Sequence, residues 1–262
     1  GHLVEGKFVT MPNPSMLIFK PEGKQDFLRC IARINEVYAT GTQYVEKGDF
    51  KGIEDTAEAL EYLREVLDAV ATNKELVVAL DTETTALYPR DGYVLGVSLA
   101  YQEDRGRYIS TDCLDETCLT ILQDIIYKCK SITFHNMKFD YKMVKYHLGL
   151  DFNRDKVDDT MVMHYLLDEN SLHGLKPLVL KFTEFGAYDD ELDSFKKSYC
   201  KQNGIKEEQF TYDLIPFDIL SKYAAIDASA SLALYNKFRP IIVANPKLEK
   251  LYKEIMMRST LF

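Results

Sequence analysis

The sequence of 262 residues has no long hydrophobic run, no paired cysteine motif and no excess of positive charge. Its apolar runs, such as the one at 76–80, are interrupted after a few residues, whereas a membrane-spanning helix needs about 20. The five cysteines form no C-x-x-C pair, which argues against a disulfide framework and against a cysteine zinc site. We therefore expect a cytoplasmic protein that makes no membrane contact.

The charge balance limits how this chain could bind a nucleic acid. Lysine and arginine total 32 against 41 aspartate and glutamate residues, a formal net charge of −9. This balance argues against electrostatic binding of a phosphate backbone over the whole surface, so any nucleic acid would need a local site. The length and the 46% of hydrophobic residues indicate one large domain, alone or with an extension. The chain begins Gly1-His2 without a signal segment, which favours a fragment of a larger protein.

Hydrophobic periodicity predicts the order of the elements. Residues 1–50 combine prolines and glycines with one possible helix at 27–37, so this extension is expected to have little structure of its own. The expected strands lie at 76–82, 93–101, 107–111, 131–135 and near 157. The expected helices lie at 56–71, about 119–126, from 137 onward, and at 160–167, 175–182 and 216–238. Residues 183–214 are expected to form a loop or insertion with short helical pieces.

Two acidic residues stand at the end of a predicted strand. Asp81 and Glu83 are two residues apart, and such positions on a strand point to the same side. Together they could bind a divalent metal ion. The alternative, that both are solvated residues at the end of a strand, is about equally compatible with this motif taken alone.

A third acid, Asp140, lies in the segment at 135–140, where a predicted strand passes into a helix. Such a junction can carry a polar group over the carboxyl edge of a sheet. The alternative is an ordinary carboxylate that complements the helix dipole in the first turn.

A phenol and a carboxylate share one face of the last predicted helix. Tyr223 and Asp227 are spaced i, i+4. The alternative is a partly buried tyrosine and an unrelated surface aspartate. Four nearby alanines favour close packing of this face against a sheet; they are Ala224, Ala225, Ala228 and Ala230.

In order and spacing, these segments resemble the three motifs of the proofreading 3′–5′ exonuclease domains of family A DNA polymerases. The motifs are DTETTAL at 81–87, NMKFD at 136–140 and YAAIDA at 223–228, and the resemblance covers about 75–238. It implies an α/β, ribonuclease H-like fold. In this fold a mixed five-stranded sheet, with three antiparallel and two further parallel strands, carries helices on both faces.

The resemblance also assigns the catalytic residues. It implies that Asp81, Glu83, Asp140 and Asp227 hold two divalent metal ions and that Tyr223 orients the attacking water. Oxygen ligands without cysteine or a histidine cluster favour Mg²⁺ or Mn²⁺ over zinc.

Three further residues match groups near the terminal nucleotide in this family: Thr84, Leu87 and Asn136. Leu87 corresponds to an apolar residue that wedges against the terminal bases. Their alternatives, respectively a strand-end cap, a core leucine and a helix N-cap, stay open at this point.

We expect three segments: the extension at 1–50, for which the resemblance offers no counterpart, an exonuclease domain at 51–240, and at 241–262 the start of a linker towards a polymerase domain. No polymerase motif lies within the 262 residues. The expected partners are the 3′ end of single-stranded DNA and the polymerase domain of the same parent protein. The expected setting is a bacterial or phage-infected cell, with an organelle as the alternative. Two alternatives remain: a free-standing ribonuclease D-like RNA exonuclease, and a catalytically silent nucleic-acid-binding module.

Overall fold

A computed structural model of the chain describes residues 48–260 and, before them, residues 3–4, 8–9, 13–19, 24, 27, 28, 31 and 34. The chain divides into two compact units, Gly1–Lys47 and Gly48–Phe262. The first contains the paired strands β1 (Leu3–Val4) and β2 (Phe8–Val9) and the helix α1 (Met16–Phe19). The helix expected at 27–37 falls largely outside the described residues.

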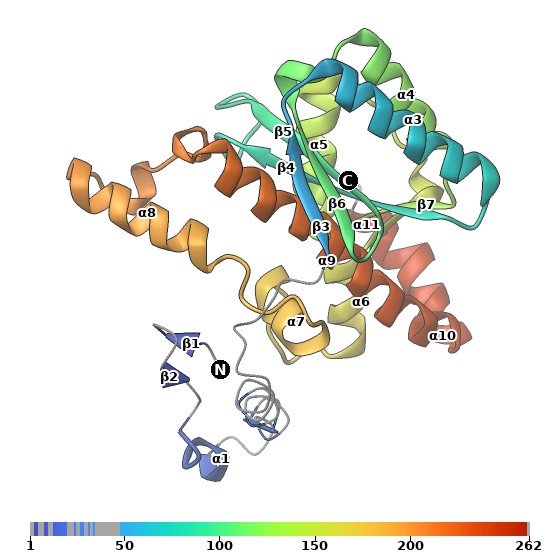
Figure 1. The fold of residues 1–262 in the computed structure, drawn as a ribbon. Helices are drawn as coiled ribbons and strands as arrows, with labels where there is room; N and C mark the ends of the chain where they lie inside the picture. Colours follow the sequence, from blue (N-terminus) through green and yellow to red (C-terminus); the bar gives the residue numbers. More distant parts are fainter. Residues whose placement is uncertain are drawn as a thin grey trace. The chain divides into compact units, whose positions relative to one another are not determined.

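The second unit alternates strands and helices (Figure 1). Its strands are β3 (Asp49–Ile53), β4 (Val77–Thr84), β5 (Val94–Gln102), β6 (Arg105–Ser110), β7 (Ser131–Phe134) and β8 (Val157–Asp159). Its longer helices are α3 (Thr56–Thr72), α4 (Glu116–Lys128), α5 (Met137–Leu148), α6 (Thr160–Leu167), α7 (Leu175–Phe182), α8 (Asp190–Asn203) and α9 (Phe217–Val243). The helical segments α10 (Pro246–Lys250), η6 (Leu251–Met256) and α11 (Met257–Thr260) follow. Among the described helices, none has both the length and the apolar character needed to cross a membrane.

Within the described residues the larger sheet has six strands in the order β3-β6-β5-β4-β7-β8. Strands β4, β5 and β6 are antiparallel, and β7 and β8 continue the sheet in parallel to β4. This arrangement confirms the expected fold class, but the expected count of five strands was one too low. The additional strand, β3, pairs in parallel with β6 at the edge of the sheet. Its sequence, DFKGI, carries little β signal, and its pairing depends on a strand that is distant in the sequence.

The two faces of the central strands carry side chains of different size. Leu80 and Leu99 are fully buried in the core that the sheet shares with α3 and α4. On the other face, Ala79 and Ala100 pack against α9, which crosses the sheet (Figure 1). A Cβ atom at Gly106 of β6 would lie only 2.2 Å from a backbone oxygen of α9. Small residues therefore let α9 approach the sheet closely, as its alanines predicted.

Residues 183–214 contain more helix than expected. Helix α8 has 14 residues, with Leu192 and Cys200 buried, and Phe195 and Tyr199 partly buried against the same apolar cluster. The expectation of a loop with short helical pieces was therefore wrong for this stretch. Its few apolar positions are separated by charged and polar residues, which obscure the helical period in the sequence.

The C-terminal segment packs back onto the end of the sheet. Tyr252 in η6 is fully buried, and its hydroxyl group donates a hydrogen bond to Asp158 Oδ1 (3.0 Å). The same hydroxyl accepts one from the backbone N–H of Asp159 (3.0 Å), and Lys253 Nζ lies 2.7 Å from Asp158 Oδ1. The expected boundaries at 51–240 and 241–262 stay predictions.

Candidate active site

Three carboxylates converge near the carboxyl end of β4. Asp81 and Glu83 project from the same side of the strand. Asp227 reaches them from α9, which packs on that face of the sheet. One oxygen atom of each carboxylate lies within 4.8 Å of the others. Three of the four acids that the sequence singled out are thus brought together.

The chain changes direction immediately after these acids. The pairing of β4 with β5 shifts between Glu83 and Thr84, and the Thr84 hydroxyl group donates a hydrogen bond to the carbonyl oxygen of Ala86 (2.9 Å). Leu87, in the loop that follows, is 76% exposed, so its interpretation as a core leucine was wrong. Its contact with a terminal base, like the role of Thr84 near the nucleotide, stays a prediction.

Asp140 lies beside the trio rather than within it. Its side chain is buried on the first turn of α5, and its Oδ1 atom accepts hydrogen bonds from the Thr82 backbone N–H (2.9 Å) and hydroxyl group (2.6 Å). Thr82 points to the opposite side of β4 from its neighbours Asp81 and Glu83. Asp140 therefore approaches the strand from the α5 side, and its role as a metal ligand stays a prediction.

Asn136 precedes α5 in a left-handed conformation, with φ = 68°, which asparagine tolerates better than most residues. Asn136 is the N-cap residue of α5, as one of its two interpretations expected, but its exposed side chain makes no capping hydrogen bond. Asp159 takes that part: its carboxylate accepts from the backbone N–H groups of Asn136 (3.1 Å) and Met137 (2.9 Å). Contact of Asn136 with a nucleotide stays a prediction.

The acids are electrostatically costly in the metal-free protein. Burial, with a contribution from the charge of Asp140, raises the pKa of Asp81 well above its usual value. Burial and the charge of Asp227 do the same for the pKa of Glu83. Burial also raises the pKa of Asp140 to about 7, although the hydrogen bonds from Thr82 oppose the shift. A cation bound among these oxygens would relieve this cost, and an all-oxygen donor set suits Mg²⁺ or Mn²⁺.

Tyr223 lies one turn of α9 before Asp227. Burial and the charge of Asp227 raise its pKa well above the ordinary value of tyrosine, so the phenol is neutral near pH 7 and keeps its proton for hydrogen bonding. Burial also raises the pKa of Tyr212, with a smaller contribution from the charges of Glu83 and Asp227, to about 12. The role of Tyr223 in orienting the attacking water stays a prediction.

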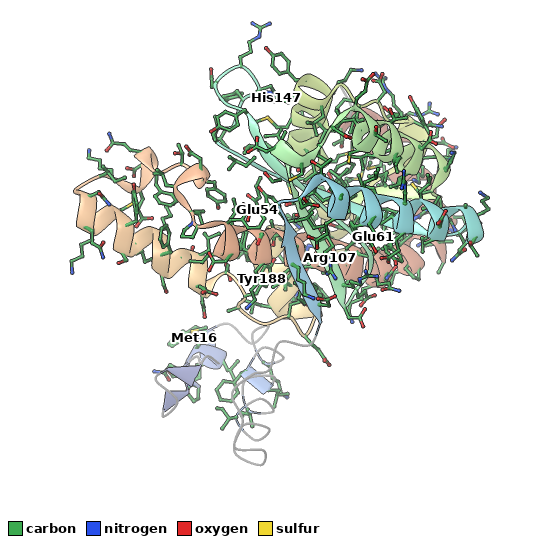
Figure 2. All side chains as sticks on the ribbon, turned by 45° about the horizontal axis from the view of Figure 1, so that its top comes forward. Met16, Glu54, Glu61, Arg107, His147 and Tyr188 are labelled. Atoms are coloured by element: carbon green, nitrogen blue, oxygen red, sulfur yellow. The ribbon has the colours of Figure 1, made fainter. Side chains whose placement is uncertain are left out.

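Sequence reasoning missed two residues of this site, Lys176 on α7 and Tyr188 before α8. Lys176 forms an ion pair with Asp227, and Tyr188 donates a hydrogen bond to the same carboxylate oxygen. Lys176 Nζ also donates to the Tyr188 hydroxyl group (2.8 Å). Tyr188 is labelled in Figure 2. No local pattern marks either residue: the packing of α7 against α9 brings Lys176 to the acids, and Tyr188 reaches them from the segment between α7 and α8.

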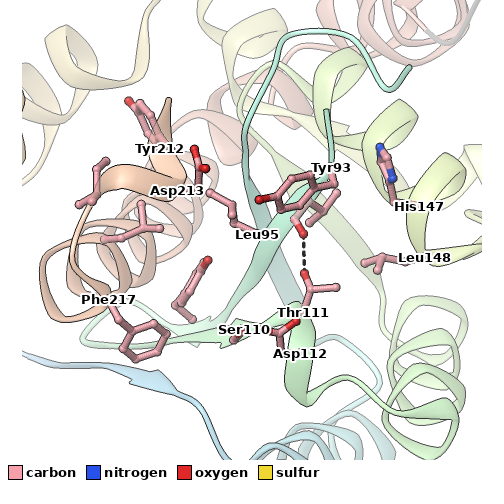
Figure 3. Close-up of a pocket in the computed structure, with 14 residues that line it drawn as sticks. Tyr93, Leu95, Ser110, Thr111, Asp112, His147, Leu148, Tyr212, Asp213 and Phe217 are labelled. Atoms are coloured by element: carbon pink, nitrogen blue, oxygen red, sulfur yellow. Dashed lines mark hydrogen bonds between the residues drawn. The ribbon is translucent and has the colours of Figure 1, made fainter. Parts of the chain in front are cut away.

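A cavity of about 460 Å³ is lined by Tyr212 but by none of the acids of the site (Figure 3). Tyr93, Tyr108 and Phe217 contribute aromatic rings to its wall. The 14 lining residues include two aspartates and neither lysine nor arginine, so the wall is poorly suited to a phosphate group.

Comparison with known proteins identifies the family. A family model described as 3′–5′ exonuclease matches residues 51–243. The chain is also 46% identical over 256 residues to a DNA polymerase of Escherichia phage T5, and the alignment covers 95% of this chain and 30% of the polymerase. The chain belongs to the 3′–5′ exonuclease family, and the resemblance to the exonuclease domains of family A DNA polymerases is confirmed. The chain spans less than a third of the length of the phage polymerase.

Solved structures show the same fold at low sequence identity. The catalytic core of RRP6 from Trypanosoma brucei superposes with a TM-score of 0.55 at 12% identity, covering 84% of this chain and 54% of that one. RNase D from Escherichia coli superposes with a TM-score of 0.53 at 15% identity, covering 82% and 51%. These similarities confirm the ribonuclease H-like fold.

Proposed function

We propose that this chain is the proofreading nuclease of a DNA polymerase, which removes nucleotides from the 3′ end of DNA as nucleoside 5′-monophosphates. The observation that supports it most directly is the convergence of Asp81, Glu83 and Asp227, with Tyr223 one helical turn away. In the reaction, a water oxygen forms a bond to the terminal phosphorus atom while the bond to the preceding 3′ oxygen breaks. That oxygen leaves with a proton as the new 3′ hydroxyl group.

Asp81, Glu83 and Asp227 would hold two divalent ions, with Asp140 contributing from the α5 side. Two such ions would supply an activated water and stabilise the charge on the leaving oxygen. The chain's own residues would do the positioning. The neutral hydroxyl group of Tyr223 can hydrogen-bond with the attacking water, and Glu83 can accept a proton from it.

The 3′ end of single-stranded DNA is the proposed substrate. Leu87 is exposed directly after the acidic strand, where it could stack against a terminal base. Thr84 is the last residue of β4, which carries Asp81 and Glu83, and Asn136 immediately precedes α5, which carries Asp140. Because the acids repel phosphate until cations bind, DNA affinity should be weak in the absence of metal.

The polymerase relative supports a polymerase domain of the same parent protein as the partner, and a bacterial or phage-infected cell as the setting. The RNA exonuclease alternative has weaker support, since identity to RNase D is 15% against 46% to the phage polymerase. The acidic cluster argues against a catalytically silent module.

A direct test compares 5′-labelled single-stranded DNA and RNA of matched sequence with Mg²⁺, with Mn²⁺ and with EDTA. We expect stepwise shortening of DNA from its 3′ end, release of 5′-monophosphates, and complete loss of activity in EDTA. Faster degradation of RNA would favour the ribonuclease D-like alternative. Metal-independent trimming, or cleavage that starts at the 5′ end, would show that the acids do not form the proposed site.

A further inference from the structure

Lys176 lies beside the acidic cluster, enclosed by two tyrosine rings. The family resemblance assigns no role to this lysine. Its Nζ atom lies 4.0 Å from the ring centroid of Tyr223 and 4.2 Å from that of Tyr188. It also donates a hydrogen bond to the Tyr188 hydroxyl group (2.8 Å) and pairs with Asp227. The Lys176 side chain is 27% exposed and that of Asp227 is 7% exposed, so bulk water screens this pair only weakly.

Most of these contacts do not depend on Asp227. Two aromatic faces and the Tyr188 hydroxyl group would still hold the ammonium group if the carboxylate turned towards a metal ion, because cation–π contacts strengthen in desolvated surroundings. Lys176 is therefore placed to remain in the site throughout the reaction instead of acting only as a counterion for the metal-free protein.

The charge balance of the site explains why a fixed cation is useful at this position. Two divalent ions would balance the four carboxylates of Asp81, Glu83, Asp140 and Asp227. The scissile phosphodiester then adds one negative charge, which a fixed ammonium group would balance. Among the ion pairs of the described residues, the pair of Lys176 with Asp227 is the one that places a cation on the acidic trio.

We propose that Lys176 is a positioning residue of the hydrolytic site: its caged ammonium group fixes Asp227 and the Tyr223 ring and supplies the positive charge that balances the scissile phosphate. This inference rests on the proposed function. If it is correct, the charge of Lys176 must affect the binding of a divalent cation and the binding of a phosphate in opposite directions. The ammonium group opposes a divalent cation at Asp227 and favours a phosphate next to it.

Titration calorimetry with the full chain tests this in two steps, first with Mn²⁺ alone and then with thymidine 5′-monophosphate at saturating Mn²⁺. Lys176→Met should bind Mn²⁺ more tightly than the wild type. It should bind the monophosphate roughly tenfold more weakly, the order expected when a charged partner is lost. Its metal-free melting temperature should fall by several degrees, since Asp227 loses its partner.

Lys181→Met is the matched control. Lys181 lies on the same helix and pairs at 3.9 Å with Asp168, outside the site, so this variant should bind both ligands as the wild type does. Lys176→Arg, which keeps the charge, should recover part of the monophosphate affinity.

The results distinguish a failure of the proposed role of Lys176 from a failure of the proposed nuclease function. If Lys176→Met weakens Mn²⁺ and monophosphate binding together, or changes neither, Lys176 is an ordinary structural lysine and the inference is overturned. If the wild type shows no saturable Mn²⁺ binding, the proposed function fails, and this inference fails with it.

Discussion

Asp159 is expected to be the structural residue on which the site depends most. Its buried carboxylate lies between the starts of two helices. On the α5 side it accepts hydrogen bonds from the backbone N–H groups of Asn136 (3.1 Å) and Met137 (2.9 Å). On the α6 side it accepts from those of Met161 (2.8 Å) and Val162 (3.4 Å). One side chain thus satisfies N–H groups at the starts of both α5, which carries Asp140, and α6.

The size of the effect follows from these bonds. Removing a capping carboxylate costs about 1 kcal/mol per helix. The N–H group of Met137, a buried residue, would lose its partner at a cost of about 1–3 kcal/mol. With about 1 kcal/mol for the α6 cap and the cost at Met137 for the α5 side, Asp159→Ala should therefore lower the free energy of unfolding by roughly 2–4 kcal/mol. Asp159→Asn keeps an oxygen for α6 but turns an NH₂ group towards Met137, so roughly 1–3 kcal/mol should be lost.

Urea unfolding followed by circular dichroism in EDTA measures both variants, and a loss of about 2 kcal/mol should move the midpoint by about 1 M. Asp55→Asn is the control. Asp55 caps α3 through hydrogen bonds from Ala57 (2.9 Å) and Glu58 (3.0 Å) on an exposed surface, and asparagine caps equally well, so the midpoint should hardly move. If Asp159→Asn unfolds at the same urea concentration as the wild type, the double cap does not carry this energy.

Three further predictions concern the acids. Asp81→Ala and Asp227→Ala should lose nearly all single-turnover nuclease activity, and Asp81→Ala should keep the metal-free melting temperature within a few degrees. Tyr223→Phe should lose activity only by roughly 10²-fold. A greater loss in Tyr223→Phe than in Asp81→Ala would contradict the assignment. Burial raises the pKa of Asp140 from 3.8 to about 7, so the folded protein binds an additional proton between these values. The contribution of Asp140 to stability is therefore fully present below about pH 4 and is lost as the pH rises through about 7, and metal-free melting curves from about pH 5 to 8 should show this decline, with Mg²⁺ reducing it. Thr82→Val removes the hydroxyl group that lies 2.6 Å from Asp140 Oδ1 and should therefore raise the pKa of Asp140 further. The acid limb of the pH–rate profile should move to higher pH, and the protein should stay folded.

The sequence by itself determined the central strands and the order of the acids. Asp81 and Glu83 share one side of β4 because the side-chain period of a strand is two. Tyr223 and Asp227 share one side of α9 because of the period of a helix. These relations are local, so they are readable before any tertiary contact is known. The small residues of α9 also predicted its close approach to the sheet.

Only the tertiary structure decided which groups surround those acids. Asp140 reaches the opposite side of β4, Asp159 joins two helices, and Lys176 comes to Asp227 from 51 residues away. The edge strand β3 likewise exists through its pairing with β6. Such contacts depend on how distant elements pack, and a single side chain that fills a place between them leaves no periodic trace in the sequence.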